Sequence, residues 1–397
     1  MESHMKRVAL LLSLIAVPSM LVYAAWSSDR LARVDRLFQQ YVDENRIAGA
    51  VALVLQDGRP VYERAFGWSD KEAGRRMATD TIFRIASQTK AFTSVAILSL
   101  MEEGKVGLSD PAGRFIPGFA KTTVTAAGGE PVPAKRAITI RDLLTHTSGL
   151  ASGPMGNSDV RKIARKPNET LADYIPRLAL TALEFQPGTR WMYSAQAGMD
   201  TLGRIVEITS GLTFDQFLEQ RIFAPLGMKD TAFYPSDDRM ARVVTLYERK
   251  DTRLSRTDTP GWLATKTLFS GGGGLWSTAE DYMQFAQMLV NGGALNGKRL
   301  LSPRTVDLMA SNHVRDLYSG ISQRLQGMGF GLTVEVVLDN VAAGRRESNG
   351  SFGWDGAFGT HFWVDRKEQL VGLLMVQEPV PVLTRDFENA VMQALVE

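Results

Sequence analysis

Apolar positions near the N-terminus fall into three successive patterns, each typical of one kind of element. Residues 28–45 carry apolar side chains three or four positions apart, which predicts an amphipathic helix. The runs 50–56 and 60–67 flank Asp57-Gly58, a dipeptide typical of tight turns, and together they predict a β-hairpin. The unbroken apolar run 91–100 predicts a buried helix.

The middle and the last third of the chain differ in pattern. Residues 101–265 alternate helical segments with Pro- and Gly-containing loops and show little strand pattern. The helices expected there include 138–150, which runs into a glycine stop, and 197–209. The last third returns to strands and ends in a helix, predicted over 329–338, 361–365, 370–377 and 384–396.

A run of four glycines, 271–274, precedes a further helix predicted over 278–291. Glycine permits a positive φ or the close approach of another segment, so the run marks a special backbone position. Ser277 is the expected N-cap of the helix, and Glu280 would complete a capping box.

This order of elements predicts an α+β fold, with one antiparallel sheet built from both ends of the chain and flanked by helices. Residues 25–100, which include the helix after Ser87, and residues 266–397 form the α/β domain. Residues 101–265 form an inserted, all-helical lobe. An active site is expected at the junction between the lobe and the sheet.

The first 24 residues predict processing rather than fold. Residues 1–5 look like vector-derived sequence that ends in a native methionine. Lys6-Arg7, the apolar run 8–22 and the small-residue pattern Val22-Tyr23-Ala24 have the layout of a secretory signal peptide, with cleavage expected after Ala24. An uncleaved membrane anchor is the alternative. A cleaved signal implies a periplasmic or secreted protein.

Composition excludes several classes of protein. With 44% hydrophobic and 22% charged residues, the 397-residue chain is typical of a globular protein. Its formal net charge of +2 gives no reason to expect a nucleic acid or an anionic membrane as partner. The absence of cysteine excludes disulfides, a cysteine nucleophile and a cysteine-ligated metal.

The candidate chemistry centres on Ser87-Gln88-Thr89-Lys90, which opens the apolar run 91–100. A Ser and a Lys three residues apart at a helix start lie on one face, where the amine can reach the hydroxyl. A serine becomes a good nucleophile when a neighbouring base takes its proton, and a desolvated lysine can be that base. The N–H groups of the helix N-terminus favour an oxyanion beside the serine. On their own, these four residues favour a helix N-cap and a solvated lysine, and the rest of the chain is needed to favour catalysis.

Two further motifs give the chain its resemblance to a known family. Tyr193-Ser194-Ala195 and Trp354-Asp355-Gly356 follow Ser87-x-x-Lys90 in that order. The chain resembles the serine β-lactamase and penicillin-binding superfamily, and within its class C β-lactamase-like branch it is similar to the family VIII carboxylesterases. The resemblance runs from about residue 28 to residue 397, and it includes 143–150 and the glycine run. Lactamases have Asn in place of Ala195 and Lys-Thr-Gly in place of the Trp-Asp-Gly motif.

The resemblance implies the β-lactamase/DD-peptidase-like fold and a catalytic trio of Ser87, Lys90 and Tyr193. Ser87 would attack the substrate carbonyl, while Lys90 and Tyr193 would share the role of base. Which of the two holds the proton is a property of the coupled pair, and the sequence leaves it open. The oxyanion hole would consist of the backbone N–H groups of Ser87 and Ala357.

Other residues in or near these motifs are expected to bind substrate or to support the structure. By resemblance, the substrate-binding residues are Trp354, Asp355, Gly356 and Gln196. His146 is expected to be a structural hydrogen-bonding residue rather than a base. His313 and His361 have no acidic or histidine neighbours at ligand spacing, so neither a metal site nor a cofactor is expected.

Three functions are compatible with these residues. The first is an exported serine carboxylesterase that forms an acyl-enzyme on Ser87 and cleaves short-chain or aryl esters. The second is a β-lactamase or D-amino-acid peptidase, for which Trp354 supplies no cation and Ala195 no amide, although Gln196 could partly replace that amide. The third is a catalytically silent binding module, which predicts the loss of a member of the trio, yet all three are present. No G-x-S-x-G motif of a different hydrolase fold occurs. The expected partner is a small-molecule ester, and the oligomeric state is left open.

Overall fold

The computed structural model describes residues 26–125, 129–150, 163, 165–250, 253–257 and 266–396. The predicted signal peptide lies outside the described residues, so its processing stays a prediction. Among the residues that are described, no helix combines the length and the apolar character that a membrane crossing requires.

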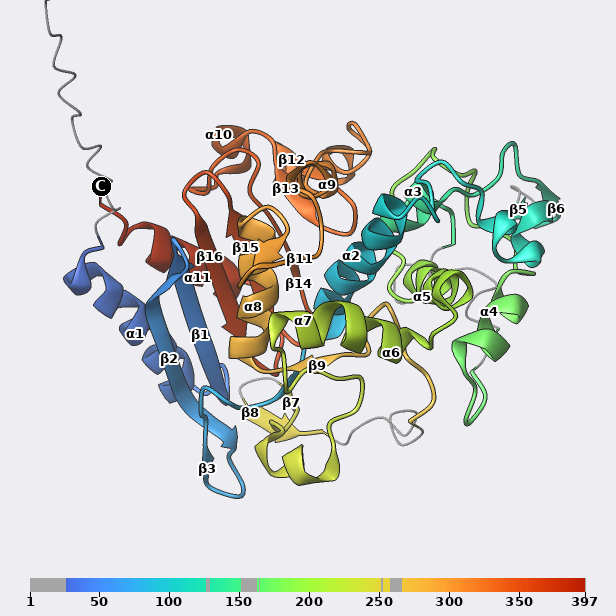
Figure 1. The fold of residues 1–397 in the computed structure, drawn as a ribbon. Coiled ribbons are helices and arrows are strands. Elements are labelled where there is room, and N and C mark those ends of the chain that lie inside the picture. Colours follow the sequence, from blue (N-terminus) through green and yellow to red (C-terminus); the bar gives the residue numbers. More distant parts are fainter. Residues whose placement is uncertain are drawn as a thin grey trace, which may run out of the picture.

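The chain folds around one eight-stranded antiparallel sheet to which both ends contribute (Figure 1). Its strands lie in the order β12-β13-β14-β15-β16-β1-β2-β3. The N-terminal hairpin meets the C-terminal hairpin at β1 and β16, which pair with Val51 opposite Met375. The predicted α+β class and the sheet built from both termini are confirmed. The strands span Gly49–Gln56 (β1), Arg59–Asp70 (β2), Arg75–Arg76 (β3), Met328–Phe330 (β12), Glu335–Val337 (β13), Phe352–Asp355 (β14), His361–Asp365 (β15) and Leu370–Met375 (β16).

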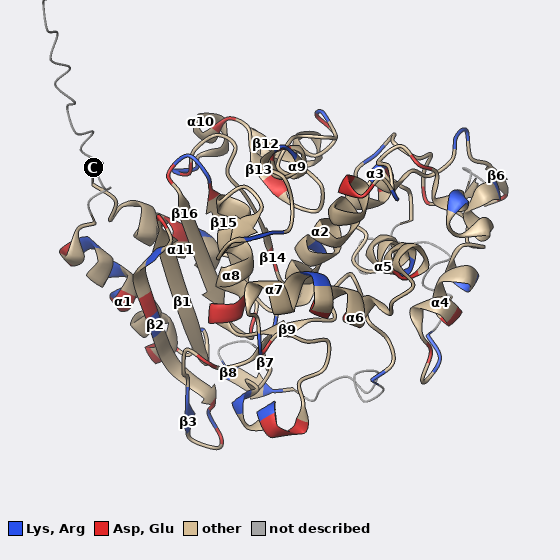
Figure 2. Cartoon of the chain, viewed as in Figure 1, with Lys and Arg blue, Asp and Glu red and all other residues tan. Residues whose placement is uncertain are grey.

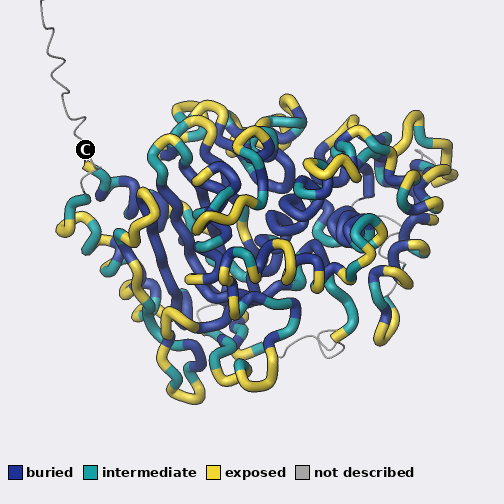
Figure 3. Tube along the Cα trace, in the orientation of Figure 1, coloured by how far each residue is buried: buried dark blue, intermediate teal, exposed yellow. Residues whose placement is uncertain are grey.

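Helices cover both faces of this sheet, which explains why β1 is apolar without alternation. Val54 and its same-face neighbours pack against α1 (Ser28–Asp43) and α11 (Leu383–Met392). Leu53, which points the other way, belongs to the larger core that includes α8 (Ala279–Val290) and α2 (Thr89–Glu102). All eight residues of β1 are therefore buried, and Figure 3 shows the sheet and α2 as the buried interior.

The segment between the two halves of the sheet forms a lobe beside α2 (Figure 1). Helix α2 is buried on all sides because it packs between α8, which covers the sheet, and the lobe helix α5 (Ala197–Ser210). Besides helices, the lobe segment contains two short hairpins that the sequence did not predict, β5–β6 and β7–β8. The remaining helices and strands of this segment are α3 (Ile140–Leu144), α4 (Leu171–Leu178), α6 (Phe214–Leu218), α7 (Ala224–Leu226), β5 (Thr123–Thr125), β6 (Pro131–Pro133), β7 (Tyr247–Lys250) and β8 (Arg253–Arg256).

Smaller elements connect these layers: β4 (Phe83–Arg84), β9 (Trp276–Ser277), β10 (Ala294–Leu295), β11 (Lys298–Arg299), α9 (Pro303–Met309) and α10 (Asn340–Ala343). Strands β4 and β9 form a short ladder immediately before Ser87. Basic and acidic residues are interspersed along the elements rather than gathered on one of them, as the small net charge suggests (Figure 2).

Three details of the sequence prediction were wrong. The predicted strand 329–338 is a hairpin, because Thr333 takes a positive φ of 72° and Gly331 N–H donates to the Val334 carbonyl at 2.8 Å. The predicted helix 138–150 ends at Leu144, after which His146 also takes a positive φ. The N-cap of α8 is Thr278 rather than Ser277, since the Thr278 side chain accepts the Asp281 N–H.

Candidate active site

Ser87 lies at a sharp bend where β4 gives way to a buried helix. It is the central residue of the 3-10 turn η1 (Ala86–Gln88), which continues directly into α2. Ala86 adopts a φ of 44°, a strained conformation for a residue with a Cβ, and so turns the chain just before the serine. Gln88 is buried whereas Ser87 keeps partial exposure. The prediction that Ser87 stands at a helix start is confirmed, and the bend leaves its side chain accessible.

Lys90 is completely buried and directs its amino group at Ser87. Its Nζ lies 3.1 Å from Ser87 Oγ, 2.8 Å from the Ala195 carbonyl oxygen and 2.5 Å from that of Gly272. A lysine has at most three N–H donors, so these three acceptors suffice to engage all of them. The contact predicted from the spacing of Ser87 and Lys90 is confirmed. The two carbonyl acceptors were not identified from the sequence.

The glycine run holds one of these carbonyls against the lysine. A Cβ on Gly272 would lie 2.5 Å from the Ala195 carbonyl oxygen and 2.8 Å from Gln196 Cα, so no side chain fits between these backbone segments. The buried carboxylate of Asp200 accepts the Gly272 N–H at 3.3 Å and pairs with Arg165 at 2.6 Å. Position 272 requires glycine because two backbone segments must approach one lysine together.

Tyr193 lies on the loop before α5, beside Lys90. The Lys90 Nζ is 4.9 Å from the centre of the Tyr193 ring, within the range of a cation–π contact. The ring also packs edge-on against His146 at 4.8 Å and lies tilted against Trp354 at 5.6 Å between centroids. The structure therefore brings the three predicted catalytic side chains, Ser87, Lys90 and Tyr193, together around one amine. Their catalytic roles stay predictions.

His146 holds the loop that carries Tyr193. Its buried Nδ1 accepts the Ser194 N–H at 3.2 Å. Burial, with the charge of Lys90 as a second cause, holds the pKa of His146 well below its ordinary value. The ring is therefore neutral and acts as a hydrogen-bond acceptor, which agrees with the structural role expected from the sequence.

Ala357 lies in the turn that follows β14, and this turn packs against the approach to Ser87. The Gly356 N–H donates to the Thr360 carbonyl at 2.7 Å and closes the turn. A Cβ on Gly356 would lie 2.6 Å from the Ile85 carbonyl oxygen, and Thr360 Oγ1 donates to that same oxygen at 3.3 Å. The two predicted N–H donors, Ser87 and Ala357, thus stand on adjacent segments. Their function as an oxyanion hole stays a prediction.

The predicted substrate-binding residues Trp354 and Asp355 lie on opposite faces of β14, as neighbouring residues of a strand do. Trp354 packs against Tyr193 and against Phe330, with the latter ring centre 5.3 Å away. The Asp355 Oδ1 instead lies 2.5 Å from His361 Nδ1. Trp354 therefore forms part of the site around the lysine, whereas the Asp355 carboxylate is engaged by a histidine.

Two expectations about polar neighbours change in the structure. The sequence analysis gave His361 no acidic neighbour, which was wrong, because it contacts both Asp355 and Glu388. The six-residue interval from Asp355 to His361 brackets a tight turn, and this signal could have revealed the pair. Gln196 precedes α5, and its side-chain oxygen accepts from Arg165 at 3.3 Å, so a role in substrate binding stays a prediction.

Comparison with known proteins places these residues in a wider context. A family model described as "Beta-lactamase" matches residues 34–397. The esterase EstB of Burkholderia gladioli is 32% identical over 87% of this chain and 89% of its own length, and a lovastatin esterase of Penicillium rubens is 30% identical over 88% and 93%. A solved structure titled "EstCE1, a hydrolase with promiscuous acyltransferase activity" superposes with a TM-score of 0.80 at 27% identity, covering 92% of this chain and 99% of that one.

Proposed function

This chain belongs to the β-lactamase family and is a serine carboxylesterase of that family, and from this premise we propose that it cleaves short-chain or small aryl esters through an acyl-enzyme on Ser87. The observation that carries the proposal is the contact of Lys90 Nζ with Ser87 Oγ at 3.1 Å, inside a buried ring of acceptors. A serine so placed lies beside the Lys90–Tyr193 pair and at the start of a helix that favours an oxyanion.

These positions support a reaction through an acyl-enzyme. Ser87 Oγ bonds to the ester carbonyl carbon while its proton passes to the Lys90–Tyr193 pair. The carbonyl oxygen becomes an oxyanion, which the N–H groups of Ser87 and Ala357 stabilise. The C–O bond to the alcohol then breaks, and the alkoxide takes the proton back from the pair. Water repeats the sequence on the acyl-enzyme and releases the acid.

Within the pair, we assign the proton-accepting role to Tyr193. The three oxygens around Lys90 Nζ match the three N–H donors of a lysine side chain. A cation 4.9 Å from the tyrosine ring would stabilise the tyrosinate formed when Tyr193 gives up its own proton. Lys90 then acts by holding charge and by orienting Ser87.

Selectivity for esters over β-lactams is the first expected result. Trp354 stands where a lactamase has a lysine and supplies no cation for a lactam carboxylate. A lost charge-assisted contact typically forfeits about 1.5–3 kcal/mol, roughly one to two decades in rate. Ester hydrolysis also requires less protonation of its leaving group than amide hydrolysis. We expect kcat/KM for a short-chain nitrophenyl ester to exceed that for a chromogenic cephalosporin by at least about 10².

A substitution at Trp354 tests the physical reason for this selectivity. Trp354→Lys places a cation on the strand and should reduce the ratio of kcat/KM for the ester to kcat/KM for the cephalosporin. Trp354→Phe keeps the aromatic contact with Tyr193 and should leave this ratio unchanged. Equal kcat/KM for both substrates in the unmodified enzyme would favour the β-lactamase alternative.

We also propose that the enzyme is exported. Lys6-Arg7, the apolar run 8–22 and Ala24 support a cleaved signal peptide. Intact-mass measurement of protein from a bacterial periplasmic fraction should then give a chain that begins at Ala25. A chain that keeps residues 6–24 and sediments with membranes would support the uncleaved anchor instead.

A further inference from the structure

The turn that carries Ala357 is closed by a side-chain pair as well as by the backbone. Asp355 and His361 are the last cross-strand partners of β14 and β15 before this turn. The imidazole of His361 is buried, and its Nδ1 lies 2.5 Å from Asp355 Oδ1. The contact therefore joins the two ends of the turn on the face of the sheet opposite Trp354.

The second nitrogen of His361 ties this pair to α11. Its Nε2 lies 2.8 Å from Glu388 Oε1, so a carboxylate faces each ring nitrogen. Burial alone would lower the pKa of His361, but the charge and hydrogen bond of Asp355, together with those of Glu388, raise it to about 10. The ring is thus an imidazolium at neutral pH, hydrogen-bonded to Asp355 through Nδ1 and ion-paired with Glu388 through Nε2.

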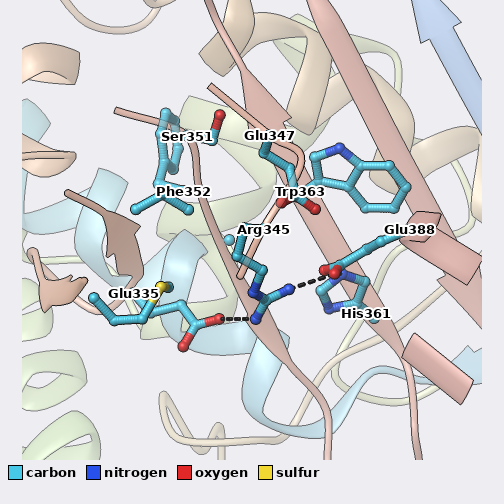
Figure 4. Close-up of a pocket in the computed structure, with 11 residues that line it drawn as sticks. Glu335, Arg345, Glu347, Ser351, Phe352, His361, Trp363 and Glu388 are labelled. Atoms are coloured by element: carbon cyan, nitrogen blue, oxygen red, sulfur yellow. Dashed lines mark hydrogen bonds and ion pairs between the residues drawn. The ribbon is translucent and has the colours of Figure 1, made fainter. Parts of the chain in front are cut away.

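Glu388 is itself fixed by a buried network on the same side of the sheet. Arg345 donates to Glu388 Oε2 and pairs with Glu335 at 3.4 Å. Figure 4 draws both contacts as dashed lines. Glu335 in turn accepts from the Tyr318 hydroxyl at 3.0 Å. His361 therefore links the turn to side chains that are held in place from α11 and β13, and it does not lie on a freely moving surface loop.

The other side of the same turn is attached to the nucleophile segment. When the Gln88 amide is oriented to satisfy its neighbours, its oxygen accepts the His361 and Phe362 N–H groups at 3.2 Å each. Its nitrogen then donates to Thr360 Oγ1 at 3.1 Å. Gln88 directly follows Ser87, so the start of β15 and the serine share one rigid connection.

We propose that His361, bridging Asp355 and Glu388, is a positioning residue that fixes the Ala357 N–H relative to Ser87. This inference rests on the proposed function, in which that N–H binds the oxyanion. Donors act in the transition state only when they are held close to the position that the oxyanion will occupy. Loosening the turn should therefore slow both acylation and deacylation while ground-state binding of the ester changes little.

Two substitutions test the bridge from its two ends. His361→Gln keeps a polar side chain but cannot reach both carboxylates, and Asp355→Ala removes the exposed end, where folding is least at risk. Each should lower kcat for a nitrophenyl ester about tenfold with KM within roughly twofold of the parent value. Trp363→Phe is the matched control, since Trp363 lies on the same face of β15 and packs against His361 with ring centres 5.6 Å apart. It should lower thermal stability and leave kcat unchanged.

Infrared spectroscopy can distinguish a misplaced oxyanion-hole N–H from a general loss of stability. In the acyl-enzyme of a slowly hydrolysed aryl ester, hydrogen bonds from the oxyanion hole polarise the acyl carbonyl and lower its infrared stretching frequency. His361→Gln and Asp355→Ala should raise that frequency, and Trp363→Phe should not move it.

Several outcomes would overturn the inference. The first is that kcat and the carbonyl frequency stay unchanged in both His361→Gln and Asp355→Ala. The second is that Asp355→Ala raises KM and keeps kcat, which would mark Asp355 as a substrate contact. The third is that Trp363→Phe loses as much kcat as the two test variants. Failure of the proposed function is distinguishable, because the parent protein would then form no acyl-enzyme on Ser87 at all, and both ideas would fall together.

Discussion

Ser87→Ala is expected to abolish ester turnover, with kcat reduced on the order of 10³-fold or more. The hydroxyl oxygen is the atom that bonds to the substrate in the proposed reaction, and the other two oxygens that Lys90 Nζ contacts are backbone carbonyls, which are not nucleophiles. The variant should stay folded, since Lys90 keeps its two carbonyl acceptors on Ala195 and Gly272. Steady-state hydrolysis of a short-chain nitrophenyl ester measures the loss.

Labelling by a fluorophosphonate probe provides the control for this result. The probe should label the parent protein and fail to label Ser87→Ala, because it reacts with the same activated oxygen. Ser99→Ala changes another serine of α2, whose hydroxyl donates to the Ala96 carbonyl at 2.9 Å, and should keep both labelling and turnover. Undiminished labelling of Ser87→Ala would show that the nucleophile lies elsewhere.

The fold could be predicted because its strongest signals are local. The apolar run in β1 and the Asp57-Gly58 turn specify a hairpin from neighbouring residues alone. The pairing of β1 with β16 joins residues more than three hundred positions apart, and no periodicity encodes it directly. It followed from the general rule that strands at both ends of a chain, separated by helices, find each other in one sheet.

The sequence predicted those contacts of the site that depend on spacing along the chain. It did not predict those that depend on tertiary structure. Ser87 and Lys90 meet because they lie on one helix face, which the sequence states. The carbonyls of Ala195 and Gly272 reach the same amine only after three distant segments have folded together. The glycine run signalled a close approach, but the sequence did not show which segment would approach it.

The error at residues 329–338 arose because tertiary contacts override local preference. Thr333 is a β-branched residue that favours extended strand, yet it takes a positive φ of 72°. Its N–H donates to the Leu144 carbonyl at 2.9 Å and its Oγ1 to the Lys90 carbonyl at 3.1 Å. These two bonds hold a conformation that the local sequence disfavours, and they brace the helix turn that carries the lysine.

Lys90→Ala and Tyr193→Phe are each expected to lower kcat about 10³-fold, because both belong to one proton-transfer unit. Phenylalanine keeps the ring contacts with His146 and Trp354, so the loss reports the hydroxyl alone. Lys90→Met, which fills the fully buried site better than alanine does, separates loss of the amine from loss of packing. Thermal unfolding of each variant confirms that the comparison is made on folded protein.

The double variant decides whether the two residues act together. Independent contributions would multiply to a loss of roughly 10⁶-fold, whereas members of one unit leave little further to lose once either is gone. Lys90 Nζ contacts Ser87 Oγ and lies 4.9 Å from the Tyr193 ring centre, so both side chains adjoin the oxygen that loses its proton. We therefore expect Lys90→Ala/Tyr193→Phe to be little worse than the poorer single variant in kcat for the nitrophenyl ester. A multiplicative loss would mean that the residues act independently, and the shared-base mechanism would have to be abandoned.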